Sequence, residues 1–154
     1  MDNIIDAKSS RKRFRGVGVI ITDYERDIFY LQKKCEHYPI EKYRGAHAFW
    51  GGNIEDGEDS YQALERELYE EFSDGWSGRV FEGSSLVADF DVKNGDDEYS
   101  FSLYECMLPK DDVYEILEQK VEEGEGVMAT KKDLETMPFI FNLEYVVRNY
   151  LRRM

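Results

Sequence analysis

The sequence has little cysteine and histidine and no long apolar run, and each shortage argues against a class of protein. The two cysteines, Cys35 and Cys106, are far apart and form no Cys-x-x-Cys pair, so neither a zinc site nor a disulfide framework is indicated. We expect both to be buried or partly buried thiols in a reducing compartment. His37 and His47 have no spacing that suggests a metal pair, so we expect structural or surface roles. No segment approaches the roughly 18 consecutive apolar residues of a membrane-spanning helix.

Proline is also scarce, and nothing in the chain marks a linker. The three prolines are scattered, and there is no low-complexity tract or internal repeat, so we expect residues 1–154 to form a single domain. At this length, folding buries roughly 70% of the unfolded surface, which provides a hydrophobic core without disulfides. The apolar content of 42% and the aromatic content of 14% are too high for a disordered acidic segment.

Positive charge is in the minority, with 20 Lys and Arg against 33 Asp and Glu and a net charge of −13. This balance argues against a generic nucleic-acid or membrane-surface binder, because both gain affinity from clustered cations. A small phosphate-bearing substrate is still compatible, since a bound divalent cation reverses the local sign. Residues 1–13 hold several cations and are expected to form a flexible basic arm. Their order, apolar before basic, is wrong for a signal peptide, and we expect a cytoplasmic protein.

Apolar periodicity and turn residues predict strands interleaved with a few helices. Strands are expected over 14–22, 27–32, 46–50, 81–92, 99–107 and 127–129. Helices are expected over 60–72, 113–120 and 142–152, with a capping box at 130–133. A loop is expected over 33–44, and the glycines of 51–57 are expected to interrupt regular structure. This order indicates an α/β or α+β sandwich with a mixed sheet.

The expected helix over 60–72 carries three carboxylates beside its apolar face. At about 100° per residue, Glu67, Glu70 and Glu71 fall within one arc of about 100°. Each like-charge pair at i+3 or i+4 costs roughly 0.2–0.5 kcal/mol, and Arg66 offsets only part of this. Such a cluster is more plausible if a cation binds it, and hard oxygen ligands suit Mg²⁺ or Mn²⁺. From the helix alone, a solvated acidic face remains the alternative.

The segment that starts at Gly52 resembles the Nudix box, which is a glycine, five residues, a glutamate, seven residues and then Arg-Glu-apolar-x-Glu-Glu. The matching positions are Gly52, Glu58, Arg66, Glu67, Leu68, Glu70 and Glu71. Two places depart from the family pattern. Ser73-Asp74 replace a glycine and an aliphatic residue, and Trp50 replaces a proline before the paired glycines. The later pair Gly75-Trp76 suggests a longer turn after the helix.

The resemblance implies an α/β/α sandwich with a mixed sheet and a hydrolase that cleaves a pyrophosphate bond with a divalent metal and an activated water. It implies that Glu67, Glu70 and Glu71 hold Mg²⁺ or Mn²⁺ together with the carbonyl of Gly51. Arg66 is then expected to orient the carboxylates of Glu58 and Glu70. The glycines, Gly52 and Gly57 among them, let the loop wrap the helix start.

Three further assignments are expectations. Glu123, in the acidic loop 122–126, is a candidate general base; Glu70 or Glu71 is the alternative, and a purely solvated loop is a third reading. Arg15, at the first strand, is a candidate phosphate contact. The resemblance also allows a homodimer.

The expected substrate is a nucleoside diphosphate linked to another moiety, of the nucleotide-sugar or ADP-ribose type. A sanitising pyrophosphatase for oxidised nucleoside triphosphates is the alternative within the enzyme class, and a non-catalytic nucleotide-sensing Nudix module is the alternative outside it. The net negative charge is concentrated in two segments, −8 over residues 52–74 and −6 over residues 111–125. The excess charge therefore fits metal recruitment rather than rejection of phosphate.

Overall fold

The computed structural model describes residues 14–119, 121 and 124–154, so the expected basic arm over 1–13 lies outside it. The elements, in chain order, are β1 (Arg15–Asp23), β2 (Ile28–Lys33), the 3₁₀ turn η2 (Glu41–Tyr43), β3 (His47–Ala48), β4 (Trp50–Asn53), α1 (Ser60–Glu71), α2 (Asp74–Glu82), β5 (Ser84–Asn94), β6 (Asp97–Leu108), α3 (Lys110–Leu117), β7 (Glu125–Thr130), α4 (Lys131–Leu134), the 3₁₀ turn η3 (Ile140–Asn142) and α5 (Glu144–Arg152).

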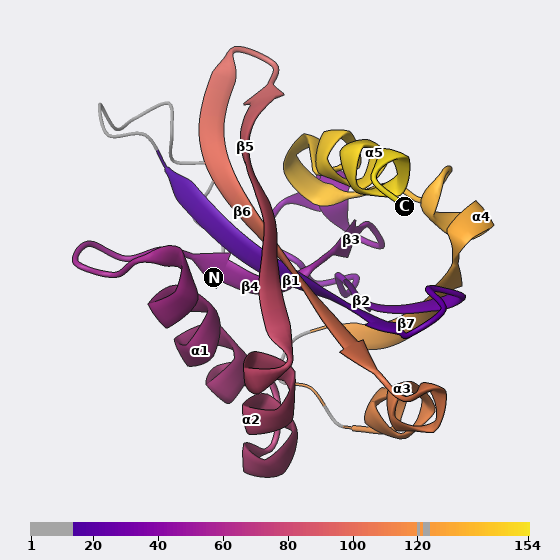
Figure 1. Ribbon diagram of the computed structural model, residues 1–154. Helices are drawn as coiled ribbons and strands as arrows, with labels where there is room; N and C mark the ends of the chain where they lie inside the picture. Colours follow the sequence, from indigo (N-terminus) through magenta and orange to yellow (C-terminus); the bar gives the residue numbers. More distant parts are fainter. Residues whose placement is uncertain (1–13, 120, 122–123) are drawn as a thin grey trace.

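One mixed sheet runs through the molecule in the order β3-β2-β1-β6-β5, with β4 on β1 and β7 on β2. The long central pair β1 and β6 is parallel, and the other ladders are antiparallel. Helices α1, α2 and α3 lie on one side of the sheet and α5 on the other (Figure 1). Each side has its own apolar cluster. The expected α/β/α sandwich with a mixed sheet is confirmed.

Strand β4 places Gly51 and Gly52 against β1. β2 pairs with the second half of β1, and β4 pairs with the first half, where Gly51 faces Gly18 and Gly52 faces Val17. The expectation that these glycines interrupt regular structure is wrong, because they complete a four-residue strand. The expected strand over 46–50 is accordingly two strands, β3 and β4, separated at Phe49.

Helix α2 is the main element that the sequence pattern misses. It follows α1 after only Phe72 and Ser73, so the expected longer turn at Gly75-Trp76 is wrong, and the strand expected from residue 81 begins at Ser84. Two glycines within nine residues lower the helix propensity of this segment, so its sequence does not indicate a helix. Packing of Trp76, Val80 and Phe81 in the apolar cluster of this side supplies the missing stabilisation.

The remaining elements shift by a few residues at their ends. The expected helix at 113–120 is α3, which begins at Lys110 and ends at Leu117, and the expected strand at 127–129 is the longer β7. The capping box at Thr130 and Asp133 is confirmed. The last helix begins at Glu144 rather than 142, after η3, in which Phe141 and Asn142 adopt positive φ. Among the described residues, no helix is long and apolar enough to cross a membrane.

A partly buried ion pair joins the β1–β2 turn to β6 and α5. Arg26 donates two hydrogen bonds, 2.8 and 2.9 Å long, to the carboxylate of Glu105, which also accepts one from the hydroxyl of Tyr150. Burial of Glu105 opposes its ionisation, but the hydrogen bonds from Arg26 and Tyr150 outweigh it and leave the pKa below its ordinary value of 4.5.

The pKa of Glu105 predicts a loss of stability in acid. Because the folded-state pKa is lowered, the stabilisation is present above the ordinary pKa of 4.5 and disappears as pH falls through the lower folded value. We expect Glu105→Gln to cost about 1–3 kcal/mol of unfolding free energy at pH 7. Urea unfolding from pH 7 to pH 3 should show this gap between wild type and variant narrowing, and an equal gap at both ends would contradict the assignment.

Candidate active site

The box begins where β4 leaves the sheet and ends on α1. A capping box at the start of α1 fixes its first turn, since Asp59 accepts from the backbone of Gln62 and the Gln62 side chain accepts from the backbone of Asp59. The helix then packs Leu64 and Leu68 against the sheet. Residues 66–71, which carry the charged groups of the box, therefore lie beside β4.

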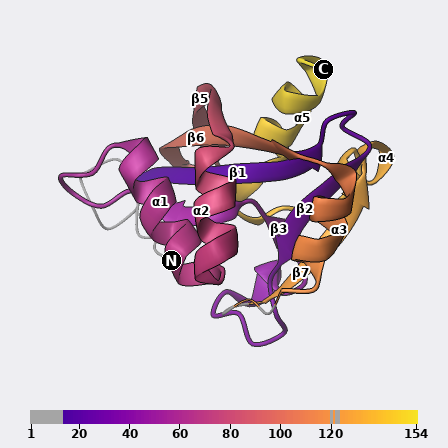
Figure 2. The same ribbon diagram turned by 60° about the horizontal axis from the view of Figure 1, so that its bottom comes forward.

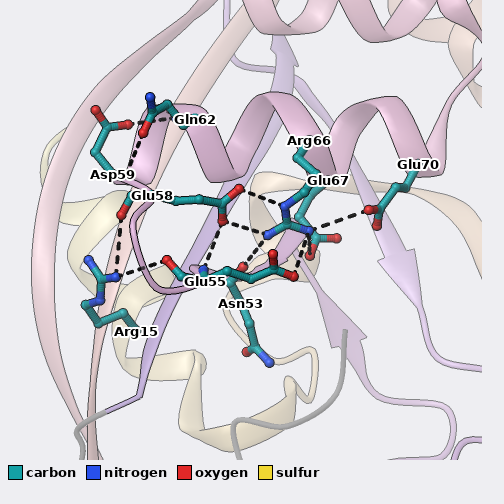
Figure 3. A network of polar contacts seen from close by, with 9 residues as sticks. All are labelled: Arg15, Asn53, Glu55, Glu58, Asp59, Gln62, Arg66, Glu67 and Glu70. Atoms are coloured by element: carbon teal, nitrogen blue, oxygen red, sulfur yellow. Dashed lines mark hydrogen bonds and ion pairs between the residues drawn. The ribbon is translucent and has the colours of Figure 1, made fainter.

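Arg66 is the centre of a polar network that ties the loop to the helix (Figure 3). Its guanidinium donates to both carboxylate oxygens of Glu58, at 2.8 and 2.9 Å, and to the carbonyl of Asn53 at 2.9 Å. The hydrogen bond from Arg66 is the main reason why the pKa of Glu58 lies below its ordinary value. The paired, fork-shaped contact is the geometry in which arginine holds a carboxylate most firmly.

The other side of the same guanidinium contacts the helix carboxylates. Nη1 of Arg66 lies 3.2 Å from Glu67 and 3.5 Å from Glu70. The contacts to Glu58 and Glu70 that the sequence predicted are thus both present. Glu55, at 3.8 Å, is a further partner that the sequence did not predict.

Glu67 is held under the glycine pair of β4. Only 3% of the residue is exposed. A Cβ atom on Gly52 would lie 2.3 Å from the Glu67 carboxylate, so only glycine leaves room for it. Burial raises the pKa of Glu67, with Arg66 opposing the rise and Glu70 adding to it. A carboxylate in this position is stabilised in its charged form by any cation that approaches it.

The next two carboxylates lie at different depths on the last turn of α1. The side chain of Glu70 is 58% exposed, whereas Glu71 is 7% exposed. Glu71 lies on the side of Tyr30, whose pKa is raised by its own burial and then by the charge of Glu71. The helix therefore presents one carboxylate to solvent and two that are largely withdrawn from it.

These residues fit a divalent cation by their donor chemistry. Among the residues that the structure describes, no three acidic, histidine or cysteine side chains are gathered tightly enough to form a ready-made metal site. The oxygen donors of Glu67, Glu70 and Glu71 nevertheless share one helix end, and the space under Gly52 brings one of them against β4. All three are the hard ligands that Mg²⁺ and Mn²⁺ prefer.

The structure places the remaining predicted residues in different ways. Gly51 adopts φ +152°, and a Cβ there would meet the Val17 carbonyl at 2.1 Å, while Gly57 adopts φ +86° in the loop. Arg15 is exposed, and its guanidinium donates at 3.4 Å to the carbonyls of Glu55 and Glu58 (Figure 3). It therefore braces the box loop, and a phosphate contact remains a prediction. Glu123 lies outside the described residues.

A family model described as the NUDIX domain matches residues 12–138, which is most of the chain and includes every box residue. The chain belongs to the Nudix hydrolase family. Its relatives act on phosphoric anhydride bonds, and the network around Arg66 is the Nudix box of this member. The Ser73-Asp74 departure at the end of the box coincides with the start of α2.

Solved structures agree with the family at the level of the fold. This Nudix chain is similar to a MutT structure from work on Aliivibrio salmonicida and Vibrio cholerae, with 23% identity, coverage of 93% of this chain and 100% of the other, and a TM-score of 0.58. It is similar to the NUDIX domain of Shewanella oneidensis NrtR, crystallised with ADP ribose, with 14% identity, 96% and 92% coverage and a TM-score of 0.64. A third match is the Ap4A hydrolase of C. elegans, with 14% identity, 92% and 97% coverage and a TM-score of 0.59. No curated protein matches the sequence significantly.

Proposed function

We propose that this Nudix hydrolase cleaves the pyrophosphate bond of a nucleoside diphosphate linked to another moiety, of the nucleotide-sugar or ADP-ribose type, with Mg²⁺ or Mn²⁺. The observation that carries the proposal is the complete carboxylate set on the end of α1, two of whose members, Glu67 and Glu70, are held by Arg66. A box that had lost catalysis would have no need to keep Glu67, Glu70 and Glu71 together against like-charge repulsion.

In this proposal, Glu67, Glu70 and Glu71 hold the metal, with the carbonyl of Gly51 as a further donor. When bound, the metal neutralises phosphate oxygens, makes water more acidic and stabilises the leaving phosphate. Arg66 positions the carboxylates through Glu58 and the carbonyl of Asn53, and it contacts no substrate.

The general base accepts the proton of the attacking water. Glu70 is accessible for this role because more than half of its side chain is exposed, and Glu71 and Glu123 are the other candidates. A base must reach the water directly or through one further water molecule. If Glu70 is the base, Glu67 and Glu71 are the carboxylates that hold the metal beside it.

Two observations support the substrate class. The similar NUDIX domain of NrtR was crystallised with ADP ribose, and the similar C. elegans protein is an Ap4A hydrolase. In both compounds, a chain of phosphates joins a nucleoside to a second group. The similarity to MutT keeps a nucleoside triphosphate sanitising activity as the second candidate.

A substrate panel tests the proposal. The purified protein is incubated with ADP-ribose, nucleotide sugars, dinucleoside polyphosphates and oxidised nucleoside triphosphates, with Mg²⁺ and without it. We expect metal-dependent release of a nucleoside monophosphate from at least one compound with a bridging diphosphate. Turnover confined to triphosphates would favour the second candidate, and tight binding without turnover would favour a nucleotide-sensing module.

A further inference from the structure

A cavity of about 510 Å³ opens at the far end of β2, away from the box loop. The loop that follows β2 forms one wall and the start of β7 forms the other, and these segments lie together at the bottom of Figure 2. Among the described residues, those that line it are Lys33, Lys34, Cys35, Glu36, Arg44, Gly45, Gly124 and Glu125. Three of these described residues are cationic and two are acidic, in a chain whose net charge is −13.

Hydrogen bonds and ring contacts fix the cationic side chains on one side of the cavity. Lys34 is only 2% exposed, and its ammonium donates to the side chain of Gln32 at 2.8 Å and lies 5.0 Å from the centre of the Tyr38 ring. Arg44 donates to the carbonyl of Tyr38 at 2.8 Å. Backbone hydrogen bonds from Lys34 to Ala46 and from Gly45 to Lys34 close the neck of the loop. The geometry holds both cations at the wall before any ligand arrives.

One face of β2 runs from the cavity toward the end of α1. The side chains of alternate residues, Tyr30 and Gln32 on β2 and Lys34 just after it, are all buried, so they form a row on the side of the sheet that α1 covers. Two glycines allow β7 and the residue before it to approach this row closely. A Cβ on Gly126 would lie 2.1 Å from the Tyr30 hydroxyl, and one on Gly124, just before β7, would lie 2.2 Å from the Lys33 carbonyl.

The two ends of this row define a length. Tyr30 packs against Phe72, the residue that directly follows the last turn of α1, and the charge of Glu71 helps to raise the pKa of Tyr30. Lys34 is four residues further along the chain, which corresponds to about 13 Å of extended strand. A ligand that reaches both places is therefore longer than a diphosphate alone.

We propose that this cavity binds an anionic group, phosphate or carboxylate, on the moiety that lies beyond the scissile diphosphate. The inference rests on the proposed hydrolase function and narrows its substrate class to compounds whose second moiety is itself negatively charged. Lys34 and Arg44 attract that group, and the box carboxylates with their metal hold the diphosphate. Ammonium and guanidinium groups are the donors that bind such anions most strongly.

Cys35 makes this testable without catalysis. It lines the cavity and is exposed, so the expectation of a buried or partly buried thiol is wrong for Cys35 and holds for Cys106, which is buried. An uncharged thiol reagent such as N-ethylmaleimide therefore reports Cys35. Modification rates are measured in metal-free buffer with inorganic tripolyphosphate or with citrate, against sodium chloride at equal ionic strength. The two probes separate phosphate from carboxylate as the preferred group.

We expect at least one of the two anions to slow modification of Cys35 by about fivefold or more, and Lys34→Met to weaken the apparent affinity by about tenfold. Arg44→Gln, at the exposed rim, is a second variant in case Lys34→Met fails to fold. Lys42→Gln is the matched control, because Lys42 lies in the same loop over the Tyr43 ring and does not line the cavity. Protection by neither anion, or equal protection in wild type and both variants, would overturn the inference. Because the modification assay involves no turnover, it tests anion binding in the cavity even if the substrate panel shows no hydrolysis.

Discussion

Glu71→Gln should reduce hydrolysis by about 10²–10⁴-fold, the range expected when a group that binds the metal or moves a proton is removed. The substitution keeps the size of the side chain and removes only its charge. Glu71 is 7% exposed at the end of α1, so its amide replacement stays in the same position while the site loses one negative ligand. Steady-state kinetics with Mg²⁺ on the best substrate of the panel measure the effect.

Glu65→Gln is the control for that variant. Glu65 belongs to the same helix, is exposed, and is not among the described partners of Arg66. Its amide should retain activity within about a factor of two, since surface substitutions away from such networks are nearly neutral. Full activity in Glu71→Gln, with a melting temperature like that of wild type, would remove Glu71 from the proposed machinery.

Gly52→Ala should lower activity by about 10²-fold while the fold persists. The added methyl group would lie 2.3 Å from the Glu67 carboxylate, so that carboxylate must move away from β4. Displacement of a reacting group by about 1 Å can cost on this order in rate. The far end of a side chain moves at low cost, so we expect the melting temperature to fall by no more than about 2–4 °C, equivalent to roughly 1 kcal/mol in a chain of this length.

Two other glycines show what the result means. Gly78→Ala, in α2 with open space around the position, should raise stability by roughly 0.5–1 kcal/mol and leave activity unchanged. Gly51→Ala would collide with the Val17 backbone at 2.1 Å and should destabilise the fold itself. If Gly52→Ala retained wild-type activity, the close packing of the Glu67 carboxylate against Gly52 would have no catalytic importance.

The parts of the site that depend on local sequence could be predicted. The helix over 60–72 and its charged arc follow from periodicity, and the contacts of Arg66 with Glu58 and Glu70 follow from the box spacing. The parts that depend on distant segments could not. The depth of Glu67 is set by Gly52 on β4, and the support of the box loop by Arg15 comes from β1.

Two further misses have different physical reasons. Helix α2 contains Gly75 and Gly78, and it is stabilised by packing rather than by propensity, so its sequence resembles a turn. The left-handed conformation of Phe141 and Asn142 is rare for residues with a Cβ and has no sequence signal, although the Asn142 side chain donates to the carbonyl of Lys93 and helps to hold it. The cavity beside Lys34 also could not be predicted, because its walls come from the end of β2 and the start of β7, which are about 90 residues apart in the sequence.

The most direct test of the central claim is hydrolysis in H₂¹⁸O with mass-spectrometric analysis of the products. Attack of metal-activated water on phosphorus predicts one ¹⁸O atom in the phosphate group of one product, and this product should form only with Mg²⁺ or Mn²⁺ present. Formation of the labelled product should nearly cease in Glu71→Gln. Label found in the non-phosphate moiety, or cleavage that proceeds equally without metal, would contradict the account.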